Sequence, residues 1–70
     1  MSSPIDKQMA EAVHEMLLEG IETCQEADRL METALYLKSY SRVYNAKKVE
    51  AEGELLIQSA RILQEAMEQQ

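Results

Sequence analysis

Two acidic segments meet at a basic stretch in the centre of the chain, Tyr36-Leu37-Lys38-Ser39-Tyr40-Ser41-Arg42-Val43-Tyr44-Asn45-Ala46-Lys47-Lys48. This stretch holds all three tyrosines of the protein and four of its seven cations, and it contains no acid. Its serines, tyrosines, valine and asparagine form helices less readily than the residues on either side. Asn45 tolerates the left-handed conformation that often ends a helix. We therefore predict a turn near residues 39–46.

The segment before this turn is patterned as one long helix. Ser3-Pro4-Ile5-Asp6 is a typical helix start, in which Ser3 caps, Pro4 takes the first helical position and Asp6 favours the helix dipole. Apolar residues then recur in steps of three and four along two adjacent seams, which makes the apolar stripe wide enough to face more than one neighbouring helix. The first seam is Met9, Val13, Met16, Gly20, Thr23, Ala27, Leu30, Ala34 and Leu37, and the second is Ala10, His14, Leu17, Ile21, Cys24, Asp28, Met31 and Leu35.

The segment after the turn repeats this pattern along Val49, Gly53, Leu56, Ala60, Leu63 and Met67. Gly20 and Gly53 interrupt the two apolar patterns, at a cost of about 1 kcal/mol each relative to alanine inside a helix. They allow two interpretations. Each glycine either lies inside a continuous helix, where two helices approach closely, or ends a helix and divides the chain into three. The seams pass Gly20 without a change of phase, which favours the continuous helix.

The whole chain is therefore predicted to be one all-α domain, residues 1–70, built as an antiparallel helical hairpin. At 1.5 Å per residue the first helix would be about 55 Å long and the second about 35 Å, so the first would overhang the second. A chain of 70 residues buries only about 60% of its unfolded surface, and a single cysteine cannot form an intrachain disulfide. We expect coiled-coil-like self-association into a larger helical bundle, a homo-oligomer.

Charge and composition exclude several classes of function. Residues 1–35 contain eight acids and two bases, residues 49–70 contain five acids and one base, and only residues 36–48 are positive. Non-specific nucleic-acid binding needs cations, so it is confined to that stretch. No apolar run is long enough to cross a membrane, and the N-terminus lacks the basic start and apolar core of a signal peptide. One unpaired cysteine suits a cytoplasmic protein.

Catalytic and metal-binding motifs are weak. Glu11-Ala12-Val13-His14 has the spacing of carboxylate-bridged metal bundles, but the chain's eleven glutamates produce this spacing readily by chance. Cys24 has acidic neighbours, which do not activate a thiol, and lies about 15 Å along the helix from His14. The sequence therefore predicts no enzyme, no cofactor and no metal site, with a carboxylate and histidine metal bundle kept as a minor alternative.

The candidate binding site is the cationic and aromatic side chains of the central stretch, which we call the turn patch: Tyr36, Lys38, Tyr40, Arg42, Tyr44, Lys47 and Lys48. Tyrosine and arginine are frequent hot-spot residues. Tyr36, Tyr40 and Tyr44 also have the spacing of one face of an unbroken helix, and they could merely close the hydrophobic core.

The expected function is a small non-enzymatic interaction protein, an adaptor, chaperone or inhibitor, that self-associates and binds another protein through the turn patch. The main alternative is an oligomer that binds a nucleotide or another small ligand between subunits, and nucleic acid is a further possible partner of the patch. Another alternative is an acidic mimic of nucleic acid that uses Glu11, Glu15, Glu22 and Glu26.

Overall fold

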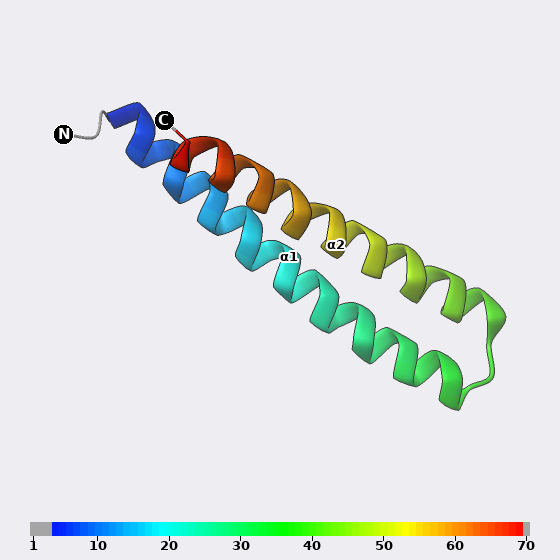
Figure 1. The fold of residues 1–70 in the computed structure, drawn as a ribbon. Helices are drawn as coiled ribbons and strands as arrows, with labels where there is room; N and C mark the ends of the chain where they lie inside the picture. Colours follow the sequence, from blue (N-terminus) through cyan, green and yellow to red (C-terminus); the bar gives the residue numbers. More distant parts are fainter. Residues whose placement is uncertain (1–3, 70) are drawn as a thin grey trace.

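The computed structural model describes the backbone of residues 4–69 and the side chains of residues 7–69. Helix α1 covers Pro4–Tyr36 and helix α2 covers Tyr40–Glu68. They pack side by side in opposite directions, and the start of α1 and the end of α2 lie opposite the connection (Figure 1). The hairpin is slender, with principal extents of 55 × 15 × 11 Å. The prediction of an all-α antiparallel hairpin is confirmed.

The connection between the helices is shorter and earlier than residues 39–46. Lys38 has a φ of 53°, so Lys38 and not Asn45 takes the left-handed position after α1. The amide of Ser39 donates to the carbonyl of Ala34 and that of Lys38 to Leu35, which closes the end of α1 as a Schellman motif. Ser39 is also the N-cap of α2, and its hydroxyl accepts a 3.4 Å hydrogen bond from the amide of Arg42. One residue thus ends the first helix and starts the second.

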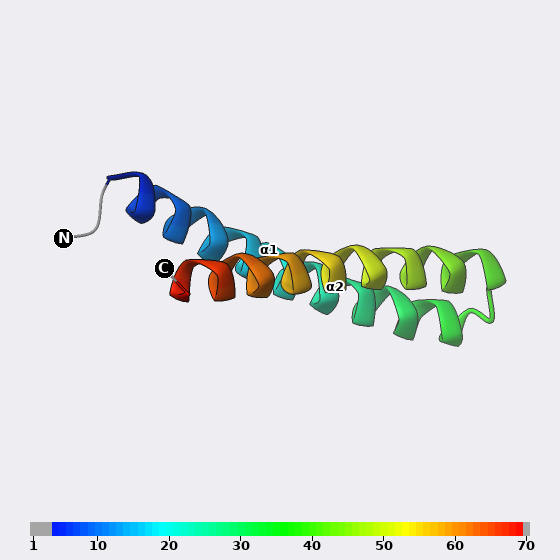
Figure 2. The ribbon, with the colours of Figure 1, turned by 45° about the horizontal axis from the view of Figure 1, so that its top comes forward.

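The two helices are more nearly equal in length than expected. Helix α1 has 33 residues and α2 has 29, which correspond to roughly 50 and 44 Å. Figure 2 shows that the start of α1 diverges from the end of α2, so the overhang is confined to that end. Helix α1 begins at Pro4 as predicted, whereas Ser3 and the side chain of Asp6 lie outside the described residues.

The three-helix alternative is wrong, because both helices continue through their glycines. Gly20 and Gly53 are buried against each other across the hairpin. A methyl group built on Gly20 would lie 2.7 Å from the Cγ1 atom of Ile57 and 3.0 Å from the carbonyl oxygen of Gly53. A methyl group on Gly53 would lie 2.7 Å from the sulfur of Cys24 and 3.0 Å from the carbonyl oxygen of Gly20. Here the two backbones themselves are in contact, which only glycine permits.

The contact between the helices is a seam of small residues at intervals of seven. The buried positions among the described side chains are Val13, Gly20, Ala27 and Ala34 on α1 and Ala46, Gly53 and Ala60 on α2. A seven-residue interval returns to the same face of a helix, so each helix presents one narrow ridge of small side chains to the other. The interaxial distance depends on the side chains at the contact, and this seam keeps it short. The larger apolar side chains consequently lie at the margins.

Candidate interaction surfaces

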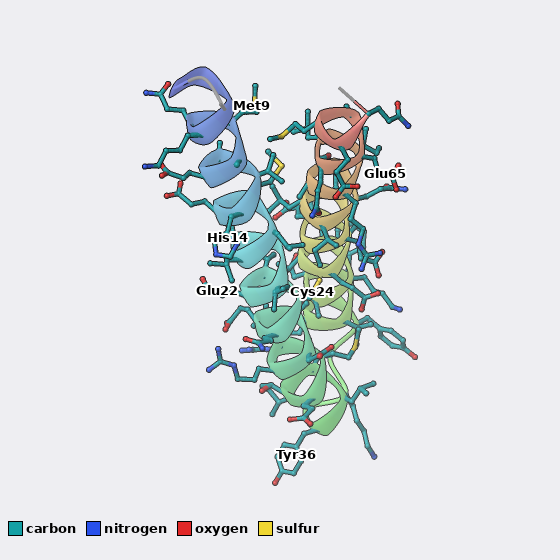
Figure 3. The ribbon with its side chains drawn as sticks, turned by 60° about the vertical axis from the view of Figure 1, so that its left-hand side comes forward. Met9, His14, Glu22, Cys24, Tyr36 and Glu65 are labelled. Carbon is teal, nitrogen blue, oxygen red and sulfur yellow. The ribbon has the colours of Figure 1, made fainter. Side chains whose placement is uncertain are left out.

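The turn patch lies at the connected end of the hairpin, and all seven of its side chains are exposed. Tyr36 is 86% exposed, Tyr40 93% and Tyr44 68%, so the three rings do not close the hydrophobic core. Figure 3 shows Tyr36 directed away from both helices at this end. The patch is accessible to a partner along its whole length.

The connection divides the turn patch instead of leaving it on one helical face. Tyr36 is the last residue of α1 and Tyr40 the first of α2, so the interpretation of an unbroken helical row of tyrosines is wrong. On α2, Tyr40, Tyr44 and Lys47 follow helical spacing along one side. Arg42 instead lines a shallow groove of about 160 Å³ with Leu30, Thr33 and Asn45.

This groove marks one side of the hairpin, which continues as an apolar surface along both helices. Leu30 is one of a set of α1 positions spaced seven residues apart, and Arg42 is the first of a similar set on α2. We call this surface the leucine face; its members are Met16, Thr23, Leu30, Leu37, Val49, Leu56 and Leu63, with Arg42 at its turn end. All of them are half-buried or exposed, because the small seam between the helices leaves them at its edge.

The other side of the hairpin is apolar on α1 but polar on α2, and we call it the mixed face. Near the turn it holds a groove of about 280 Å³ lined by Leu35, Tyr40 and Val43 among others. At the open end it holds a groove of about 470 Å³ lined by Ala10, Val13, His14, Leu17, Gln64, Met67 and Glu68. Seven-residue steps along α2 from Tyr40 and Val43 place Lys47, Glu50, Glu54, Ile57, Arg61, Gln64 and Glu68 on this side. Only Val43 and Ile57 of this α2 surface are aliphatic.

The residues with potential chemistry do not form a reactive site. His14 is exposed at the rim of the open-end groove, whereas Cys24 is half-buried and faces Gly53 across the hairpin (Figure 3). Within the described part of the chain, no three histidine, cysteine or acidic side chains come together as a metal site would require. Glu11, the carboxylate of the Glu-x-x-His spacing, is exposed.

Charge is distributed unevenly along the hairpin. The four cations of the turn patch lie at one end, and the segments that form the middle and the open end are net acidic. Among the described side chains, Arg29 and Glu26 form the one ion pair, at 2.7 Å, and both are largely exposed. The four cations of the turn patch form no ion pair with any described side chain, which makes the connected end a local positive pole on an acidic protein.

In comparisons with known proteins, no family model, no curated protein and no solved structure matches this chain. Neither helix contains a segment apolar enough to cross a bilayer, as judged over the described residues.

The structural roles of three residues were not predicted from the sequence. Lys38 and Ser39 shape the connection, and Ala46 opens the small seam on α2. The signal for Ala46 was present in the sequence, because Ala46, Gly53 and Ala60 repeat every seven residues. The sequence also contained a signal for Ser39, because serine is a preferred N-cap residue.

Proposed function

We propose that this protein is a small, non-enzymatic helical interaction module that self-associates and binds a macromolecular partner through the turn patch. One observation carries the proposal. The described side chains buried in the hairpin are no larger than valine, while twelve large hydrophobic side chains are exposed. A large exposed apolar surface is typical of a contact with another polypeptide. The hairpin provides helix faces, and its core is too small to account for this much apolar sequence.

The partner that best fits the turn patch is an acidic polypeptide surface. Four cations and three exposed tyrosines lie around the connected end of the hairpin, and the central segment that contains them has no acid. Such a positive pole attracts an acidic partner, while the tyrosine rings supply contact area at low cost in conformational entropy. An adaptor or inhibitor role follows from this chemistry.

A binding experiment with defined probes tests the patch. Fluorescence anisotropy would measure the affinity of the labelled protein for polyglutamate and for a single-stranded oligonucleotide at several salt concentrations. We expect polyglutamate to bind, and Lys47→Ala/Lys48→Ala to weaken binding by about tenfold. The control Lys7→Ala/Arg61→Ala removes the same charge at the open end and should leave the affinity within about twofold.

The outcomes separate the two candidate functions. Equal loss of affinity in both double variants would remove the patch as the binding site. Preference for the oligonucleotide, with an affinity that falls steeply as salt rises, would favour the nucleotide or nucleic-acid alternative. Light scattering at several concentrations tests self-association separately, and a mass of 8.0 kDa at every concentration would contradict it.

A further inference from the structure

We infer that a second copy of this chain covers the leucine face, and that the two hairpins pair antiparallel about a two-fold axis as a four-helix bundle. The inference rests on the self-association in the proposed function and specifies its surface, stoichiometry and orientation. It is drawn from three properties of the hairpin: its excess surface, the composition of its two sides and its charge polarity.

The exposed area of the hairpin is too large for a compact monomer and fits a dimer. A compact protein of 8.0 kDa exposes about 4,500 Å², whereas this chain exposes 5886 Å². A compact protein of twice the mass exposes about 7,400 Å², so two hairpins would bury about 4,400 Å² in reaching that value. Obligate homodimer interfaces bury roughly 2,000–5,000 Å². The excess surface therefore matches one extensive contact with an identical chain.

The composition of the two sides selects the leucine face as that contact. Both helices contribute aliphatic side chains to it, so the same surface can meet itself in a closed two-fold interface. The mixed face offers aliphatic side chains mainly from α1, and a copy docked there would bury charged residues along the length of α2, such as Glu50 and Arg61, whereas the charged residue of the leucine-face series, Arg42, lies at its turn end. Burial of unpaired charges is costly, which disfavours the mixed face.

Thr23, the uncharged polar residue of the leucine face, can be buried without leaving its hydroxyl proton unpaired. Its hydroxyl donates a 2.7 Å hydrogen bond to the carbonyl oxygen of Glu19 in the same helix. A buried hydroxyl costs free energy only when its hydrogen-bonding capacity is unmet. A second copy can therefore cover Thr23 without providing a partner for its hydroxyl proton.

Charge polarity sets the relative direction of the two hairpins. The turn end carries the four cations of residues 36–48, whereas residues 1–20 and 54–70 at the open end are net acidic. A parallel pair would place the two positive ends together and the two acidic ends together. An antiparallel pair places each positive end beside an acidic end, which lowers the electrostatic free energy of association.

The surface of the dimer is tested by two double substitutions at positions of similar exposure. Leu30 and Leu63 on the leucine face are each 37% exposed, and Ile21 and Leu18 away from it are 40% and 46% exposed. We expect the wild-type chain to form a dimer by light scattering. Leu30→Gln/Leu63→Gln should raise the dimer dissociation constant by more than about a hundredfold, because the dimer loses four buried leucines. Leu18→Gln/Ile21→Gln should remain dimeric.

The results distinguish failure of the inference from failure of the proposed function. A monomer at all concentrations would overturn both self-association and the dimer. A dimer that survives Leu30→Gln/Leu63→Gln but dissociates in Leu18→Gln/Ile21→Gln would overturn the leucine face while self-association stands. A stable tetramer or larger assembly would also overturn the closed dimer.

The relative orientation of the two hairpins is tested in a variant that leaves the leucine face unchanged. This test does not depend on whether the glutamine variants fold. A spin label at Tyr40→Cys, in a Cys24→Ala background, reports the distance between the two turn ends by pulsed electron paramagnetic resonance. Antiparallel hairpins place these labels about 40 Å apart, from 1.5 Å of rise per residue. A distance near 20 Å, about two helix diameters, would show a parallel pair and overturn the orientation.

Discussion

The middle of the hairpin and its turn end are held together in opposite ways. In the middle, Gly20 and Gly53 bring the two backbones into contact, and stability there depends on the absence of side chains. At the turn end, hydrogen bonds to Ser39 fix the connection, and the tyrosines beside it contribute little to packing. Long-range packing thus sets the distance between the helices, whereas local chemistry sets where the chain reverses.

This difference predicts different sensitivities to substitution. A larger side chain in the middle must push two helices apart along much of their length, whereas a change at the turn removes one local interaction. Unfolding should be compared at one fixed protein concentration, because the proposed self-association would make the apparent stability depend on concentration.

The largest effect is expected from Gly53→Leu. Even the first carbon of the new side chain would lie 3.0 Å from the backbone of α1, and overpacking of this kind should lower the free energy of unfolding by at least about 3 kcal/mol. Thermal unfolding followed by circular dichroism measures the loss. Ala51→Leu adds the same side chain at an exposed position of the same helix and should change stability by less than about 0.5 kcal/mol. Equal stability of the two variants would contradict the close contact.

A smaller loss is expected from Ser39→Ala. This change removes the hydroxyl that accepts the amide of Arg42 at the start of α2, at a cost of about 1 kcal/mol in unfolding free energy. Urea denaturation measures it. Ser41→Ala removes a hydroxyl that contacts Ser39 without capping the helix, and it should cost less than half as much. The N-cap assignment fails if Ser41→Ala is the more damaging change.

A gain is expected from Lys38→Gly. Lys38 holds a φ of 53°, which is strained for a residue with a Cβ atom and free of strain for glycine. Unfolding free energy should rise by about 0.5 kcal/mol, since the greater freedom of glycine in the unfolded chain offsets part of the relief. Lys47→Gly, in the interior of α2, should instead destabilise by about 1 kcal/mol. A loss of stability in Lys38→Gly would contradict the left-handed conformation.

The smallest effect is expected from Glu26→Gln, which removes the ion pair with Arg29. Both side chains are largely exposed, so the loss should be about 0.3 kcal/mol and should vanish at high salt. Glu22→Gln, an exposed carboxylate on the same helix with no ion pair in the structure, provides the baseline. A loss above about 1 kcal/mol would contradict the weak, solvent-exposed character of this ion pair.

The sequence was sufficient to predict the hairpin but not the position of its turn. The apolar periodicity of each helix is visible in the sequence itself. It also predicted that the first helix continues through Gly20. Helix propensity pointed to residues 39–46, yet Ser41, Val43 and Asn45 all lie inside α2, since tertiary packing overrides a weak local preference. The chain reverses earlier because Ser39 can serve both helices at once.

The sequence identified the residues of the turn patch but not their exposure or arrangement. The tyrosines could have closed the core, and whether Tyr36, Tyr40 and Tyr44 form one row depends on where α1 ends. Small residues at intervals of seven were visible in the sequence as well. Their structural consequence can be seen only when the two helices are placed together. Helices in contact through alanine and glycine leave the leucines at the margins of the contact.

The start of α1 and the end of α2 lie at the end of the hairpin remote from the turn patch (Figure 1). A hairpin attached to a surface through either end would therefore hold its patch outward, at a distance close to its 55 Å length. Two hairpins paired antiparallel would carry one patch at each end of a rod, pointing in opposite directions. Such a particle is bivalent: it can bridge two partners, but it cannot place both patches on one small target.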